Sequence, residues 1–118
     1  MSTSHMFRVR AVVQPHRLSA VVRGLHSLPH FPGFTIVDVR GQGRGRGAGG
    51  AYKVVEDDID YHPRSSVEVV CAPPQVDAIV EAMVRSARTG HAGDGIVTVE
   101  PVTRVVRIRT GEEGEGAV

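Results

Sequence analysis

The stretch FRVRAVVQPHRLSAVVRGLHS, residues 7–27, changes from the period of a strand to the period of a helix at Pro15. Its first part, residues 7–14, alternates and carries the β-branched residues typical of a strand. Proline is favoured in the first turn of a helix, so Pro15 indicates where the helix begins. The apolar side chains that follow recur at helical spacing, at Leu18, Val21, Val22 and Leu25. The stretch therefore predicts a strand that leads directly into a helix ending near Ser27.

The same alternation of strand and helix continues through the rest of the chain. A second helix is predicted to open at the proline pair 73–74 and to end at residues 89–90. Its inner stripe consists of Val76, Ile79, Val80, Met83 and Val84. The remaining strands are predicted at residues 34–40, 67–71 (starting near Arg64), 96–100 and 105–108. This β-α-β-β-α-β order with a small terminal strand predicts an α+β, ferredoxin-like fold.

Size and composition set broad limits on function. A chain of 118 residues fits one domain, and a formal net charge of +1 gives no reason to expect nucleic acid as a partner. No apolar run approaches the roughly 20 residues that a membrane span needs. The single cysteine, Cys71, ends an apolar run and is predicted to be buried. Together with the polar start of the sequence, it leads us to expect a cytoplasmic protein.

A long insertion, residues 41–63, separates the second and third predicted strands. Its first part, GQGRGRGAGG, is more than half glycine, and its second part, EDDIDYH, is acidic. Such a segment buries too little apolar surface to hold one shape alone. Long loops in compact domains are usually functional, so we expect this one to be mobile until a ligand or partner orders it.

Two further segments carry groups that suit phosphate. TGHAGDG, residues 89–95, is a glycine-rich loop whose backbone amides can converge on an anion. RVVRIRTG, residues 104–111, places Arg107 and Arg109 two apart, so an extended segment would present both guanidinium groups on one face. Guanidinium groups can bind phosphate oxygens in pairs. Alone, each segment has a plainer interpretation, as a tight turn or as solvated charge, but together they predict a nucleotide site.

The sequence resembles the PII signal-transduction family over residues 7–118. The residues that carry the resemblance are VQPHRL at 13–18, GQGRG at 41–45, TGHAGDG at 89–95 and VVRIRTGEEGEGAV at 105–118. The stretch at residues 16–33 is more similar to a divergent branch, which we associate with genes for heavy-metal efflux pumps. The resemblance implies one PII-like domain over residues 6–118 and a homotrimer of ferredoxin-like subunits.

The resemblance also implies an adenine nucleotide, AMP, ADP or ATP, in each cleft between subunits, with magnesium left open. Residues 41–63 form the loop called the T-loop, and residues 89–95 form the B-loop. In each cleft, the base of the T-loop and the B-loop of one subunit meet the C-terminal segment, residues 104–118, of the next. The implied binding residues are Gly41, Gly43 and Arg44 at the T-loop base, Thr35, Glu68 and Val70 at the adenine and ribose end, Gly93, Asp94 and Gly95 in the B-loop, and Arg107 and Arg109. The implied function is non-enzymatic regulation of a protein partner through the T-loop, the partner being a membrane transporter such as a metal efflux pump.

Several residues depart from the family pattern. Ile96 stands where the family carries a phosphate-binding lysine, and His91 replaces the lysine inside the loop. Loss of positive charge should weaken ATP binding more than ADP or AMP binding. At three positions in or near the family's site for magnesium and 2-oxoglutarate, this chain carries other residues, namely Gly45, Arg64 and Gln14. These replacements argue against 2-oxoglutarate sensing. The T-loop positions that are modified in some members are occupied here by Asp57 and Val55.

Two alternatives remain open at the level of sequence. One is a metal-responsive protein without nucleotide, suggested by scattered histidines and by the acidic run Glu56, Asp57, Asp58 and Asp60 before His62. No HxxxH within one clear helix and no CxxC supports it, so no metal ligands are assigned. The other is a small nucleotide hydrolase, although no catalytic constellation is apparent.

Overall fold

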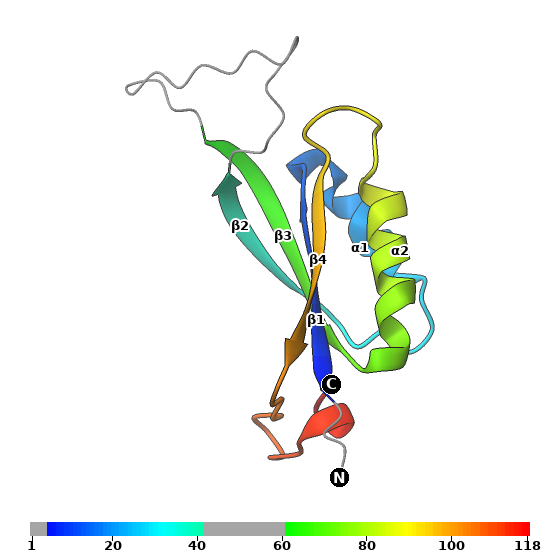
Figure 1. Cartoon of the computed structure of the whole chain (residues 1–118), viewed down its shortest axis with the longest axis vertical. Helices are drawn as coiled ribbons and strands as arrows, with labels where there is room; N and C mark the ends of the chain where they lie inside the picture. The colour runs from blue at the N-terminus through cyan, green and yellow to red at the C-terminus, as the bar shows by residue number, and fades with distance from the viewer. Residues whose placement is uncertain (1–4, 42–60) are drawn as a thin grey trace.

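The computed structural model of the chain describes residues 5–41 and 61–118, and over them four strands and two helices alternate (Figure 1). The elements are β1 (Met6–Val13), α1 (Leu18–His26), β2 (Thr35–Gly41), β3 (His62–Cys71), α2 (Val76–Ala87) and β4 (Gly95–Val102). The strands form one sheet in the order β2-β3-β1-β4, and all neighbours are antiparallel. This is the ferredoxin-like arrangement, so the predicted α+β fold is confirmed.

Each helix begins where proline ends a strand. A 3-10 turn, Pro15–Arg17, precedes α1, and a second one, Pro73–Gln75, precedes α2. Proline lacks the amide that a sheet ladder requires, but its fixed φ suits the first turn of a helix. The two strand-to-helix junctions predicted from sequence are therefore found where the prolines place them.

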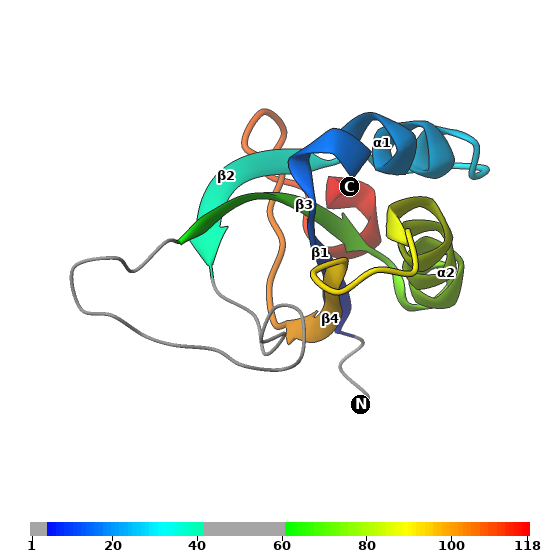
Figure 2. The ribbon, with the colours of Figure 1, turned by 90° about the horizontal axis from the view of Figure 1, so that it is seen from above.

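Both helices cover the same face of the sheet, and within residues 5–41 and 61–118 no helix covers the other face (Figure 2). The buried core lies between the helices and the sheet. It consists of Val9, Ala11, Val13, Val21, Leu25, Val67, Val69, Cys71, Ile79, Ala82, Met83 and Ala87. Burial of Cys71 confirms the prediction made for it, and desolvation raises the pKa of its thiol.

The face of the sheet without helices, which we call the open face, is polar near its centre. Arg8 of β1 forms ion pairs with Glu68 of β3, at 3.3 Å, and with Glu100 of β4. Beside them, Arg10 Nε donates a hydrogen bond to Ser66 Oγ at 2.9 Å. Charged and polar side chains therefore alternate with the buried residues along the strands, as expected for a sheet packed on one side.

The prediction of a short strand at residues 105–108 is wrong. Only an isolated bridge joins Val106 to Glu113 there, and the chain then turns. The amide of Gly111 donates to the carbonyl of Arg107 at 2.8 Å, with Gly111 at a φ of 77°. Because in the described part of the chain this segment bridges only to the few residues that follow it, its β-branched side chains do not produce a strand.

Residues 42–60 lie outside the described part of the chain, so the expected ordering of the insertion is untested. The insertion is bounded by the ends of β2 and β3, where Gly41 pairs with His62. None of the helices within residues 5–41 and 61–118 has the length and apolar character to cross a membrane.

Candidate functional site

The B-loop joins the end of α2 to the start of β4, and Asp94 holds it together. The Asp94 carboxylate accepts hydrogen bonds from the amides of Thr89, at 2.8 Å, and Gly90, at 2.9 Å. It also accepts one from the Thr89 hydroxyl. The hydrogen bonds from Thr89 lower the pKa of Asp94, since they favour the charged carboxylate. Asp94 thus shapes the loop from within, a role that the sequence interpretation did not assign to it.

Two glycines of the B-loop occupy conformations that other residues rarely adopt. Gly93 has a φ of 89° and Gly95 a φ of 106°. A Cβ atom on Gly95 would lie 1.8 Å from the carbonyl oxygen of Val12. Within the described part of the chain, the amides of Ala92 and Gly93 donate no hydrogen bond. The loop therefore has the open backbone donors that an anion needs.

Side chains from two neighbouring strands reach the B-loop at Gly93. Gln14, just after β1, donates from Nε2 to the Gly93 carbonyl at 2.8 Å. Arg64, near the start of β3, is close enough that a Cβ atom on Gly93 would lie 3.5 Å from its Nη2. Gln14 and Arg64 were noted in the sequence only as departures from the family pattern. Their contact with the loop depends on strand register, which no local motif reveals.

The residues implied for the adenine and ribose end lie together on β2 and β3. Thr35 pairs with Glu68 across the two strands, and Val70 follows two residues later on β3. The Glu68 carboxylate accepts hydrogen bonds from Arg8, at 3.3 Å, and from the hydroxyl of Ser66, at 3.5 Å. Glu68 lies four residues along β3 from Arg64, a separation of about 13 Å at the rise of a strand, and Thr35 lies opposite Glu68 on β2.

Of the residues implied for the T-loop base, Gly41 is described, and Gly43 and Arg44 lie outside the described residues. Gly41 ends β2 opposite His62. Val13, at the end of β1, pairs with both Ser65 of β3 and Gly95 of β4. The start of β3, where His62 pairs with Gly41, and the start of β4, where the B-loop ends, are therefore at the same end of the sheet. The T-loop base and the B-loop are therefore at the same end of the sheet (Figure 1).

Arg107 and Arg109 do not share one face of an extended segment, which corrects that expectation. Arg107 is half-buried and donates from Nε to the carbonyl of Ala117 at 3.4 Å. Arg109 is exposed in the turn that follows. The reason is the turn at Gly111, which reverses the chain within four residues of Arg107. Both arginines nevertheless belong to one short segment.

This segment lies at the end of the sheet opposite to the B-loop (Figure 1). β4 begins at Gly95, in the B-loop, and ends at Val102, shortly before the arginines. The seven steps between these residues correspond to about 23 Å at the rise of a strand. One chain therefore does not bring the predicted phosphate loop and the predicted arginine pair together.

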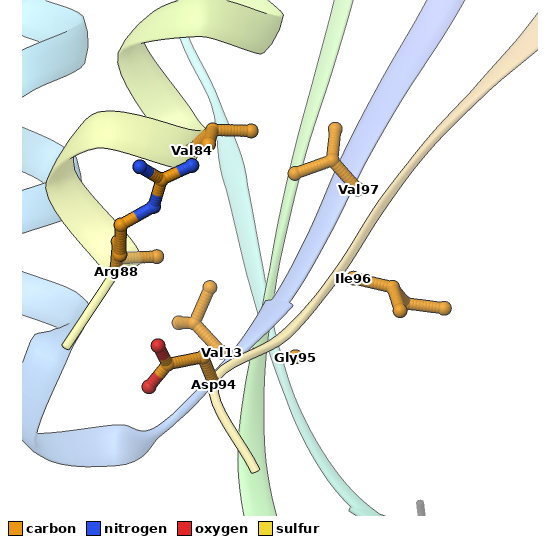
Figure 3. Close-up of a pocket in the computed structure, with 8 residues that line it drawn as sticks. Val13, Val84, Arg88, Asp94, Gly95, Ile96 and Val97 are labelled. Atoms are coloured by element: carbon orange, nitrogen blue, oxygen red, sulfur yellow. The ribbon is translucent and has the colours of Figure 1, made fainter. Parts of the chain in front are cut away.

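A small pocket borders the B-loop on the helix side of the sheet (Figure 3). Val84 of α2 and Val97 of β4 line it, with Arg88 and Asp94 at its edge, and its volume is about 180 Å³. Ile96 points away from Val97, toward the open face, and is 65% exposed. Pockets that enclose small-molecule ligands usually measure about 300 Å³ or more, so this one does not hold a nucleotide by itself.

The described residues give no support to a metal centre. Within residues 5–41 and 61–118, no three histidine, cysteine or acidic side chains come together in a way that could hold a metal ion. The acidic run before His62 lies outside the described residues, so that part of the metal hypothesis is untested.

Comparison with known proteins agrees with the geometry. The family described as nitrogen regulatory protein P-II matches residues 6–112. Nitrogen regulatory protein P-II of Pasteurella multocida is 39% identical over 113 residues, covering 96% of this chain and all of that protein. The P-II 2 protein of Methanothermobacter thermautotrophicus is also 39% identical, over 96% of this chain and 97% of its own.

A solved structure of Arabidopsis thaliana PII bound to citrate has the same fold. Its TM-score is 0.77 at 33% identity, with 97% of this chain and 90% of that chain covered. Nucleotide binding is characteristic of PII proteins, which are regulatory signal transducers rather than enzymes. The match extends over nearly the whole chain in both sequence and structure, and the chain therefore belongs to the nitrogen regulatory protein P-II family.

Proposed function

We propose that this protein is a homotrimeric regulator, one PII-like domain over residues 6–118, that binds an adenine nucleotide between neighbouring chains. Nucleotide binding is common to the family, whereas the identity of the nucleotide is our inference. The B-loop of one chain, with Gly93, Asp94 and Gly95, holds the phosphates. Arg107 and Arg109 of the next chain complete the site.

The observation that carries this proposal is the separation of the two halves of the site. The segment that follows β4 and carries Arg107 and Arg109 lies at one end of the sheet, and the B-loop, which precedes β4, lies at the other (Figure 1). Backbone amides and guanidinium groups both suit phosphate, but neither set alone encloses a ligand with several charges. Association of chains brings the opposite ends together, and a closed ring uses every end.

Mixing two defective variants tests the shared site directly. A Gly93→Val chain should lose the B-loop half, because Val is strained at a positive φ and a Cβ there would approach Gln14 within 3.1 Å. An Arg107→Ala, Arg109→Ala chain should lose the other half. Each variant alone should bind no ADP. Unfolded and refolded together at equal amounts, they should regain about a quarter of the wild-type sites, since each cleft then draws both halves at random from two chain types.

The outcomes separate the possible arrangements. No recovery in mixed assemblies that gel filtration shows to be trimers would place both halves in one chain and overturn the shared site. A refolded mixture of wild-type chains with the arginine variant is the control, because half of its clefts should bind. Absence of heat on titrating the wild-type protein with AMP, ADP and ATP would reject the nucleotide altogether.

The preferred nucleotide should be one with few phosphates. Residues 89–96 contain no lysine or arginine, and Ile96 is an apolar side chain on the open face. Because the negative charge of the ligand grows with each phosphate, a loop without its own cation favours AMP or ADP over ATP. Isothermal titration with and without magnesium measures this order, and tighter binding of ATP would contradict it.

The regulatory output is proposed to pass through the T-loop to a protein partner, a membrane transporter such as a metal efflux pump. Nucleotide and partner can be coupled only if the nucleotide binds the two states of the loop with different affinity. Deletion of Gly45 to Tyr61 should abolish capture of the partner and leave the assembly intact. A deletion variant that still captures the transporter would exclude the T-loop as the contact.

A further inference from the structure

The B-loop contains no lysine or arginine, and this raises the question of which side chain neutralises a phosphate there. Its ionisable residues are His91 and Asp94. Asp94 is negative and is already bonded to Thr89 and Gly90. An anion in the loop therefore needs a cation from another part of the same chain or from a neighbour.

Arg64 is a cationic side chain of the same chain that reaches the loop at Gly93, whereas Arg88 lies near Asp94 on the helix side. Its Nη2 is directed to Gly93, 3.5 Å from where a Cβ atom would be. Its Nη1 donates to the carbonyl of Pro63 at 2.8 Å, which fixes the guanidinium group at the start of β3. Gln14 donates to the carbonyl of Gly93 from the adjacent strand, so Arg64 and Gln14 approach the loop side by side.

Strand register explains why these groups meet. Val13 pairs with Ser65 on one side and with Gly95 on the other. The next position outward is Gln14, just after β1, which by continuation of the register lies between Arg64 and Asp94 of the B-loop. Arg64 shares the open face of the sheet with Ser66 and Glu68, because alternate residues of a strand face the same way.

Arg64 is not neutralised by any carboxylate among the described residues, a state that it shares with Arg10 and Arg40 of the sheet. By contrast, Arg8 of β1 pairs with Glu68 and Glu100, and Arg104, just beyond β4, pairs with Glu113. Within residues 5–41 and 61–118, Arg64 forms no ion pair. What distinguishes Arg64 from Arg10 and Arg40 is its place beside the backbone amides of Ala92 and Gly93, which donate no hydrogen bond within the described residues, and a guanidinium group there has the chemistry of a phosphate contact.

We propose that Arg64 is a specificity-determining residue that contacts the phosphates of the bound nucleotide from the same chain as the B-loop. This inference rests on the proposed nucleotide site. Arg64 lies on the open face of the sheet, the same face to which the uncharged side chain of Ile96 points. It therefore distinguishes nucleotides by phosphate number, because a single cation contributes more to a ligand with more negative charge.

The test compares the binding of AMP, ADP and ATP to Arg64→Gln and to the wild-type protein by isothermal titration. We expect the affinity for ADP and ATP to fall about ten-fold or more, the usual loss for a charge-assisted hydrogen bond, while that for AMP falls less than three-fold. Arg23→Gln is the matched control, because it removes the same charge from an exposed position on α1 and should change nothing.

Two further measurements protect the test against misfolding of the glutamine variant. Arg64→Lys keeps the charge, so it should retain most of the wild-type affinity for ADP. In the wild-type protein, phenylglyoxal modification of Arg64, followed by peptide mass analysis, should be slowed by ADP more than by AMP.

The possible failures are distinguishable. If wild-type protein binds no nucleotide, the proposed site and this role both fall. If it binds and Arg64→Gln lowers the affinity for all three nucleotides equally, or for none, only the role of Arg64 is wrong. A lysine variant as poor as the glutamine variant, or ADP that fails to protect Arg64, would likewise reject a contact based on charge.

Discussion

Replacement of Gly95 by alanine should destabilise the fold more than any comparable change in the B-loop. Gly95 is where the loop becomes β4, and its φ of 106° lies in a region that side chains disfavour. The added Cβ would lie 1.8 Å from the carbonyl oxygen of Val12 and 3.0 Å from its carbon. Both atoms are backbone, so no side-chain rotation relieves the overlap.

The magnitude follows from these two effects. Holding alanine at a positive φ costs about 1–2 kcal/mol. Relief of the overlap requires the start of β4 to move away from β1, which breaks one or two backbone hydrogen bonds at about 1 kcal/mol each. The free energy of unfolding should therefore fall by about 3 kcal/mol, a factor of about 150 in the folding equilibrium.

Gly90→Ala is the matched control for this prediction. Gly90 has a φ of 88°, but a Cβ atom there would have no neighbour within 4 Å. It should cost only the conformational term, about 1–2 kcal/mol. Urea unfolding followed by circular dichroism, at one protein concentration because assembly adds to stability, measures both variants. Equal losses for the two variants would refute the reasoning, since they would mean that the contact with Val12 has no energetic weight.

Three further predictions follow from the described contacts. The lowered pKa of Asp94 gives the wild-type protein a stabilising contribution above pH about 4, which is lost as the pH falls through that pKa. Asp94→Asn should remove this contribution. Urea midpoints that change equally with pH in both proteins below pH about 4 would contradict the prediction. Gly24→Ala places a Cβ atom 2.2 Å from the hydroxyl of Ser86 and should lower the free energy of unfolding by about 1–3 kcal/mol. A second change, Ser86→Ala, should restore most of that loss. If the losses of the two single variants simply add in the double variant, the prediction is wrong. Arg107→Ala and Arg109→Ala should each weaken nucleotide binding, but only Arg107→Ala should also lower the melting temperature, because Arg107 donates to the carbonyl of Ala117.

Most of the fold could be predicted because its signals are local. The change of period at Pro15 and at the prolines of residues 73–74 places both helices, and the alternation in residues 7–14 gives β1 within one residue of its observed bounds. Proline and glycine act through the backbone of their own residues, so they need no tertiary context. The ferredoxin-like order then follows from the sequence of elements.

The C-terminal segment was not predictable in the same way. Residues 105–108 have the β-branched composition of a strand, but a strand also requires a partner with free backbone groups. The segment bridges only at Val106 and Glu113, and Gly111 turns the chain between them. Composition reports the preference of a segment, whereas the partner is a property of the whole fold.

The contacts around the B-loop show the same limit within the candidate site. Thr89 and Asp94 lie five residues apart, and side chains of these types often bond to nearby backbone, so their interaction had a local signal. Gln14 and Arg64 are 50 residues apart in the chain and meet at Gly93 only because β1 pairs with β3 and β4 in one register. A one-residue slip of either strand would turn these side chains to the other face.

The start of β3 links the proposed ligand contact to the proposed output. Arg64 lies beside the B-loop, and two residues earlier His62 pairs with Gly41, where the T-loop leaves the sheet. The same guanidinium group faces Gly93 with Nη2 and donates from Nη1 to the carbonyl of Pro63, the last T-loop residue, so the proposed phosphate contact and the T-loop base would share one side chain. Under the proposed function, a phosphate in the B-loop would therefore act on a contact at the T-loop base without any movement of the core. That is how a ligand at the sheet end can favour one state of the T-loop over another, as a nucleotide-dependent regulator requires.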